Sequence, residues 1–125
     1  MNFFSFSSPV PNVLDGKFRI VNSAWDESLA DKDSTMFAEL ASKLETEIMN
    51  VLLSNHSPEE QFNVKVTEFS PGSVVVNFRI STNPDVELSK KELFQTLDQT
   101  IRDNNGYISS TLYKLDTESL DLERT

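Results

Sequence analysis

The chain contains no cysteine, only three glycines and a single histidine among its 125 residues. Without cysteine it can form neither a disulfide framework nor a cysteine-based zinc site. No apolar run approaches the roughly 18 residues of a membrane-spanning helix. The glycines Gly16, Gly72 and Gly106 lie far apart, so no glycine-rich loop is present to cradle a phosphate. We therefore expect no cofactor and no metal.

Acidic residues outnumber basic ones by 20 to 11, which gives a formal charge of -9 at pH 7. This charge repels phosphate groups, so neither nucleic acid nor direct contact with an anionic membrane is expected. Hydrophobic residues make up 38% of the chain, enough for one domain with its own core. The stretch from Met1 to Phe6 lacks the basic and long apolar regions of a signal peptide. We expect the chain to be a fragment of a larger protein, with Met1 supplied for expression.

Hydrophobic periodicity in the first half of the chain predicts one strand and one long helix. Residues 1–16, which include two prolines, are predicted to form an extended lead-in. Residues 17–22 alternate between apolar and polar side chains and are predicted to form the first strand. Ser34 is a candidate N-cap for a helix. The apolar positions of this helix follow one stripe, made of Phe37, Leu40, Ala41, Leu44, Ile48, Val51 and Leu52.

The middle of the chain predicts a hairpin of two half-buried strands. Residues 62–66 and 74–80 alternate, and Pro71-Gly72 between them is a turn signal. The alternation slips before the turn, because Glu68 stands where the next apolar residue belongs and Phe69 takes its place. Such a slip predicts a bulge.

The last part of the chain predicts a second helix and a final strand. Ser89 and Glu92 have capping-box spacing, and Asn105-Gly106 ends the helix with a residue suited to a left-handed C-cap. The apolar positions of this helix are Leu93, Phe94, Leu97 and Ile101. Residues 110–115 are predicted to form the last strand, and residues 119–125 a solvated acidic tail.

The order β-α-β-β-α-β predicts an α+β, ferredoxin-like sandwich, in which both helices cover one face of a four-stranded antiparallel sheet. The predicted domain spans residues 17–118. Two other classes share this topology. An acylphosphatase-like enzyme would need a glycine-rich phosphate loop, and an RNA-binding module is opposed by the acidity and by the lack of its aromatic strand motif.

The turn between the second and third predicted strands carries Gly72-Ser73-Val74-Val75-Val76. Phe18-Arg19-Ile20, Trp25 and the helix around Phe37 precede it at matching places in the element order. Over residues 18–116 the chain resembles a SEA domain, an extracellular module of mucins and other surface proteins. This resemblance implies self-cleavage between Gly72 and Ser73, with Ser73 as nucleophile and Gly72 as the scissile carbonyl.

The residues at this turn permit such a reaction. The Ser73 hydroxyl can reach the Gly72 carbonyl carbon through a five-membered ring, which moves the acyl group from nitrogen to oxygen and leaves an ester. Water hydrolyses an ester far more readily than the resonance-stabilised amide. A tight turn between two fixed strands can distort the amide, and about 12° of twist costs roughly 1 kcal/mol.

Two functional classes follow. In the first, the chain is a membrane-proximal, extracellular or cell-surface module that cuts itself once and whose halves remain a non-covalent heterodimer. It then acts in a single turnover and is not an enzyme in the usual sense. In the second, it is an uncleaved spacer or interaction domain that binds other cell-surface or matrix proteins. An ordinary Pro-Gly hairpin without chemistry fits the second class.

Other candidate residues carry weaker signals. His56 is predicted to lie on a surface loop, remote in sequence from Ser73. The acids between Asp26 and Asp33 lack the spacing of an EF-hand and are interpreted as solvated. Asn55-His56-Ser57 is an N-glycosylation sequon on a predicted loop, although Pro58 directly follows it.

Overall fold

The computed structural model describes residues 12–55, 62–82, 89–108 and 113–124. Its four strands are β1 (Asn12–Ile20), β2 (Phe62–Pro71), β3 (Val74–Thr82) and β4 (Leu115–Arg124). They form one antiparallel sheet in the order β2-β3-β1-β4. Two helices, α1 (Thr35–Asn55) and α2 (Lys90–Asp103), and a short 3-10 helix η1 (Glu27–Ala30) complete the fold. The predicted β-α-β-β-α-β order and fold class are confirmed.

Both long helices begin where their capping residues predict. The Ser34 hydroxyl accepts a hydrogen bond from the Phe37 amide at 3.1 Å, and the Ser89 hydroxyl accepts one from the Glu92 amide at 3.3 Å. At the end of α2, Gly106 has φ +90° and its amide donates to the Ile101 carbonyl at 2.8 Å. Asn104 is the C-cap, and Asn105 and Gly106 follow it with positive φ, so the Asn105-Gly106 pair ends α2 with a left-handed backbone.

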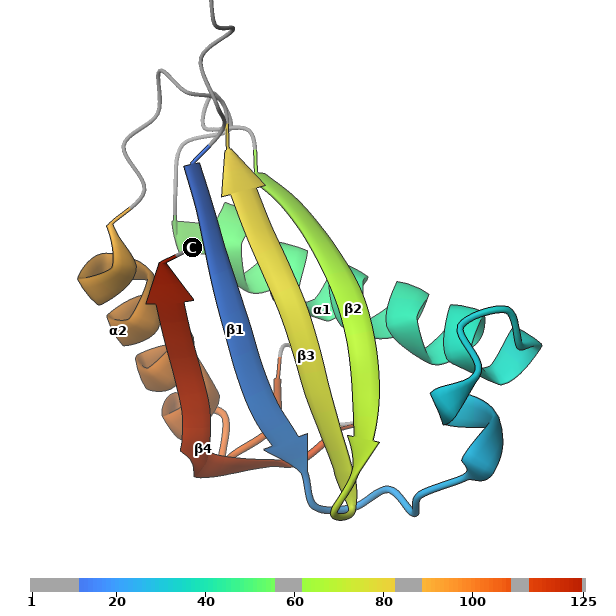
Figure 1. Ribbon diagram of the computed structural model, residues 1–125. Helices are drawn as coiled ribbons and strands as arrows, with labels where there is room; N and C mark the ends of the chain where they lie inside the picture. Colours follow the sequence, from blue (N-terminus) through green and yellow to red (C-terminus); the bar gives the residue numbers. More distant parts are fainter. Residues whose placement is uncertain (1–11, 56–61, 83–88, 109–112, 125) are drawn as a thin grey trace, which may run out of the picture.

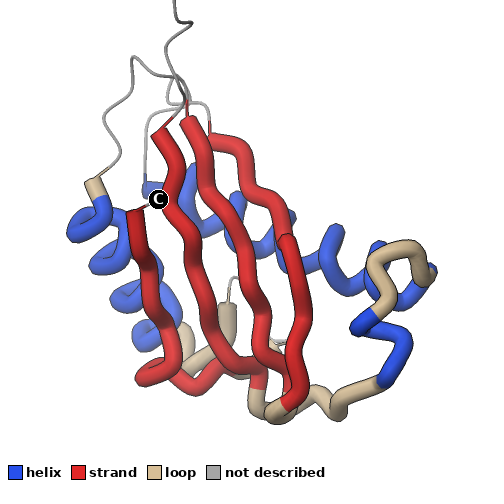
Figure 2. The backbone as a smooth tube through the Cα atoms, viewed as in Figure 1, coloured by secondary structure: helices blue, strands red, loops and turns tan. Residues whose placement is uncertain are grey.

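Both long helices lie behind the sheet, and no described helix covers its other face (Figure 1). The tube view shows the same two layers, with the four strands in front (Figure 2). Side chains from both layers bury one core, which includes the predicted stripe of α1 and the inward positions of β3. The fully buried large side chains are Leu14, Phe18, Ile20, Leu44, Ile48, Leu52, Phe78, Ile80, Leu93, Leu97, Ile101 and Ile108.

The first strand begins earlier than the periodicity predicts. β1 starts at Asn12, so residues 12–16 belong to the sheet and the prediction of a lead-in through residue 16 is wrong there. The reason is Gly16, which stands at an inward position between Leu14 and Phe18 and interrupts the apolar alternation. An ideal Cβ on Gly16 would lie 2.3 Å from Cζ of Phe78, so the ring of Phe78 occupies the space of the missing side chain.

The last strand lies later than predicted. β4 runs from Leu115 to Arg124, whereas the prediction placed a strand at 110–115 and a solvated tail at 119–125. Leu120 and Leu122 are buried, so the tail prediction is wrong for residues 119–124. Acidic residues alternate with these leucines and hide their period. The ladder with β1 is also irregular, and the Arg19 amide donates to the Ser119 hydroxyl at 2.8 Å.

Candidate functional site

The β2–β3 hairpin is closed by only two residues, Gly72 and Ser73. Pro71 pairs with Val74 across the ladder, so the strands continue up to the turn on both sides. The turn lies at the end of the sheet where β1 also ends, because Val74 pairs with Ile20 on its other side. Figure 1 shows it at the lower end of the sheet, where the edge strand β2 joins β3.

Both turn residues have a left-handed backbone. Gly72 has φ +118° and Ser73 has φ +55°. Two-residue hairpins favour turns with positive φ, because that twist matches the twist of the flanking strands. Glycine adopts such angles freely, whereas a side-chain-bearing residue is held there at a cost of about 1–3 kcal/mol. The conformational strain therefore falls on Ser73, directly after the predicted scissile bond.

Buried side chains hold the hairpin on both sides of the turn. Val74 and Val76 are fully buried on β3. On β2, Phe69 is buried and packs edge-on against Phe37 of α1, with 5.0 Å between ring centroids. Because the strands are anchored in the core, the turn cannot relax by shifting either strand outward.

The turn itself is open to water. Pro71, Gly72 and Ser73 are all exposed. An ester formed at this place would be accessible to solvent, as hydrolysis requires. The turn thus combines a strained backbone, a hydroxyl next to a glycine carbonyl, and a supply of water.

A surface pocket of about 280 Å³ lies beside the start of β3, and its lining includes Val74, Leu40 and Tyr113. Burial, together with the negative charge of Glu47, raises the pKa of Tyr113. Neither Gly72 nor Ser73 lines this pocket.

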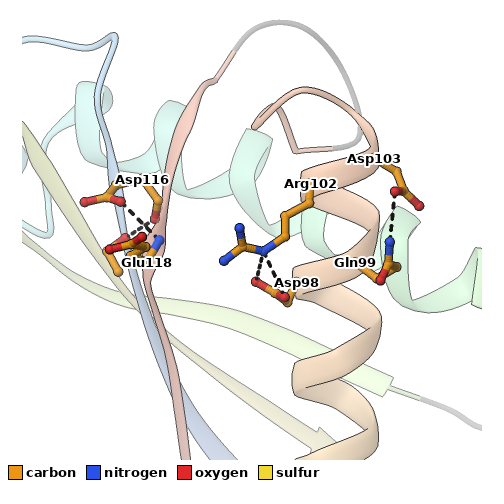
Figure 3. Close-up of polar contacts among 7 residues, drawn as sticks. Asp98, Gln99, Arg102, Asp103, Asp116 and Glu118 are labelled. Carbon is orange, nitrogen blue, oxygen red and sulfur yellow. Dashed lines mark hydrogen bonds and ion pairs between the residues drawn. The ribbon is translucent and has the colours of Figure 1, made fainter.

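The polar side chains of α2 and the start of β4 are paired locally (Figure 3). Arg102 contacts Asp98 at 3.0 Å, and the Gln99 amide donates to Asp103 at 2.9 Å. Asp116 accepts from the Glu118 amide at 3.1 Å, which together with Arg19 lowers its pKa. Asp98 and Asp103 bind partners within α2, whereas Asp116 also pairs with Arg19 across the β1–β4 ladder.

The acidic segment before α1 is organised in the same local way. Asp26 accepts from the hydroxyl and the amide of Ser28, at 2.6 and 2.9 Å, and both bonds lower its pKa. Asp31 accepts from the Asp33 amide at 2.9 Å. Among the described residues, no three histidine, cysteine, aspartate or glutamate side chains gather as a metal site would require.

The predicted glycosylation site lies only partly within the described residues. Asn55 is the last residue of α1, while His56 and Ser57 lie outside the described ranges. The prediction that His56 is a surface residue therefore stays a prediction, as does glycan attachment at Asn55. None of the helices in the described ranges is long and apolar enough to cross a membrane.

One contact near the hairpin was not predicted. The Glu45 carboxylate of α1 accepts a hydrogen bond from the Val66 amide of β2 at 2.8 Å. Val66 stands at the bulge, since the β2–β3 register shifts between Val66 and Glu68. The slip at Glu68 signals the bulge in the sequence, but no local pattern indicates which side chain binds it.

Comparison with known proteins agrees with this fold and turn. The SEA domain profile matches residues 12–118, a range that begins with β1 and includes both helices and the Gly72-Ser73 turn. The match starts five residues before the predicted domain boundary at 17, as the observed start of β1 does. No curated protein matches the chain. The extent of the profile match over the described fold shows that the chain belongs to the SEA domain family.

Proposed function

We propose that this domain cleaves its own chain between Gly72 and Ser73. The observation that carries the proposal is the left-handed backbone of Ser73, at φ +55°, in a two-residue turn between anchored strands. The reaction takes place once per molecule, so the domain is a self-processing module and not a turnover enzyme.

The reaction begins with attack of the Ser73 oxygen on the Gly72 carbonyl carbon. The C–N bond breaks as the C–O bond forms, and the hydroxyl proton passes to the departing nitrogen, which becomes the free amine of Ser73. Water then adds to the resulting ester. Its hydrolysis leaves a carboxylate on Gly72 and restores the Ser73 hydroxyl, so the net change is hydrolysis of one peptide bond.

Relief of backbone strain accounts for part of the acceleration of the acyl shift. Opening the Gly72–Ser73 bond frees Ser73 from its left-handed backbone, which costs about 1–3 kcal/mol while the turn is closed. If the transition state releases that energy, the step is accelerated about five- to 150-fold. Distortion of the amide itself would add to this value. Folding is thus the source of the driving force.

The sheet order supports a second part of the proposal, that the halves stay together. A cut after Gly72 gives one half with β1, α1 and β2 and another with β3, α2 and β4. In the order β2-β3-β1-β4, the two halves then alternate. Every ladder of the sheet joins a strand of one half to a strand of the other. The product is a non-covalent heterodimer with an unchanged core.

Membership of the SEA family supports a proposal about where the domain lies. SEA domains are typically extracellular, and we propose that this one lies outside the cell or at its surface, near the membrane, in a larger secreted or single-pass protein. Other surface or matrix proteins are proposed partners. The second function is an uncleaved spacer or interaction domain, which the exposed, polar turn also permits.

Replacing the nucleophile tests the proposal. Ser73→Ala removes the hydroxyl, and we expect one intact chain on a denaturing gel, whereas the parent chain gives pieces of 72 and 53 residues. Ser70→Ala is the matched control, because Ser70 lies in the same hairpin three residues away, and it should still be cut. Mass spectrometry should find Ser73 as the new N-terminus.

The alternatives give different results. An intact parent chain after complete folding supports the spacer function. Cleavage of Ser73→Ala at the same bond would exclude the acyl shift and assign the cut to an outside protease.

A further inference from the structure

The bulge in β2 determines how many residues close the hairpin. Before the bulge Val66 pairs with Phe78, and after it Pro71 pairs with Val74. Continued without a bulge, the first register would pair Ser70 with Val74 and leave three residues, 71–73, in the loop. The extra residue, Thr67, thus shortens the loop to Gly72 and Ser73. A hairpin closed by two residues has fewer backbone conformations to choose from than one closed by three.

Side chains hold the bulge on both sides. From α1, Glu45 accepts the Val66 amide hydrogen at 2.8 Å, at the outer edge of the sheet. From within the ladder, the Thr67 hydroxyl donates to the Asn77 carbonyl at 3.2 Å. A charged acceptor on a backbone amide makes a stronger bond than a neutral one, so the Glu45 contact is the stronger of these two polar contacts at the bulge.

A second contact joins α1 to β2, on the far side of the bulge. Phe37 packs on Phe69 at 5.0 Å, while Glu45 binds Val66. The two helix positions lie about 12 Å apart along α1, and the two strand positions about 10 Å apart along β2. Without the bulge, the alternation from Val64 and Val66 would turn Glu68 inward and Phe69 outward. The two contacts therefore support the same register and oppose sliding of the strand.

We infer that Glu45 is a positioning residue for self-cleavage: by binding the Val66 amide it holds β2 in the bulged register and so confines the turn to Gly72 and Ser73. The inference rests on the proposed function. Glu45 acts at a distance, through the strand, and takes no part in the bond changes.

Three variants test this role by the rate at which newly folded chain is cut. Glu45→Ala removes the acceptor, and we expect cleavage to slow about tenfold or more, because the three-residue loop becomes accessible. Glu45→Gln keeps an oxygen acceptor and should recover most of the rate. Glu39→Ala, which removes an exposed glutamate from the same helix, should leave the rate within about twofold.

A loss of rate through general destabilisation must be separated from positioning. Ile101→Val, in the core of α2 and away from β2, is the comparison, with stabilities measured in the Ser73→Ala background. The inference is overturned if Ile101→Val slows cleavage as much as Glu45→Ala at equal stability. It is also overturned if Glu45→Ala is cut as fast as Glu39→Ala, or if Glu45→Gln is as slow as Glu45→Ala.

A second readout keeps the inference distinct from the proposed function. If the parent chain is never cut, the proposed function fails, and the register of the intact hairpin is compared by NMR. Cross-strand contacts that move from the Pro71–Val74 pair to Ser70–Val74 in Glu45→Ala support the positioning role. An unchanged register overturns it.

Discussion

At the scale of single residues, Gly72 shows that space and conformation are separate requirements. A Cβ on Gly72 would meet only Cγ2 of Val75 at 3.7 Å, which is an ordinary contact. The backbone angle of +118°, however, is one that residues with a side chain rarely adopt. The turn therefore needs glycine for its torsion angle, and the neighbouring Ser73 has a positive angle without that freedom.

Gly72→Ala should lower the free energy of unfolding by about 1–3 kcal/mol through backbone strain alone. Urea unfolding is measured in the Ser73→Ala background, which keeps the chain intact. The fluorescence of the single tryptophan, Trp25, reports the unfolding. Ser70→Ala is the control and should change stability by less than about 0.5 kcal/mol. Equal stability of the glycine and alanine proteins would mean that the turn is not held at a positive φ.

At the scale of elements, the packing of β2 and β3 against the core constrains the one peptide bond between Gly72 and Ser73. The buried Phe69 and Val74 lie on either side of the turn, and only four residues separate them. A longer loop would leave both anchors in place but would spread the distortion over more bonds.

Inserting two glycines between Pro71 and Gly72 should therefore slow cleavage by far more than it destabilises the fold. The entropic cost of closing a loop grows slowly with its length, so the insertion should lower the free energy of unfolding by only about 1 kcal/mol. Cleavage is followed on denaturing gels, and circular dichroism establishes that both proteins are folded. Equal cleavage rates in the parent and lengthened chains would remove strain from the mechanism.

The packing between β1 and β3 depends on a second glycine for a different reason. A Cβ on Gly16 would lie 2.3 Å from Cζ of Phe78 and 2.8 Å from Cδ2 of Leu122, so Gly16→Ala should overpack the core and cost about 1–3 kcal/mol. Thermal unfolding in the Ser73→Ala background measures this loss. Adding Phe78→Leu replaces the obstructing ring with a smaller side chain. The double variant should then lose less stability than the sum of the losses in the two single variants. Simple additivity would contradict the contact.

At the scale of the whole molecule, cleavage leaves two halves that cannot form the sheet separately. β1 and β2 are not neighbours in the sheet, and neither are β3 and β4. On β3, the side chains of Val74, Val76, Phe78 and Ile80 are fully buried, and each contributes about 1.5–3 kcal/mol. Separation of the halves must therefore break all three ladders and expose the core, which makes dissociation equivalent to unfolding.

The cleaved domain should accordingly unfold at a midpoint that rises with protein concentration, because unfolding releases two chains. Intact Ser73→Ala is the matched control, and its midpoint should not depend on concentration. Separately produced chains of residues 1–72 and 73–125 should each lack native circular dichroism and regain it on mixing. A half that folds alone would contradict the alternation of the strands.

The sequence by itself determined the parts of the protein that depend on near neighbours. Ser34 and Ser89 predict the starts of the helices because a cap bonds to amides two or three residues away. Residues close together in the sequence likewise predict three other features: the apolar stripe of α1, the slip at Glu68 and the Pro71-Gly72 turn. These features were sufficient to predict the element order, the fold class and the family.

Only the tertiary structure decided what depends on residues remote in sequence. Gly16 hides the start of β1 because its missing side chain is replaced by Phe78, 62 residues later. Acidic residues hide β4, whose Leu120 and Leu122 become apolar positions only against the helices and β1. Glu45 meets the bulge because α1 passes beneath β2. Strand pairing and side-chain packing join distant segments, so their outcome is visible only once the chain has folded.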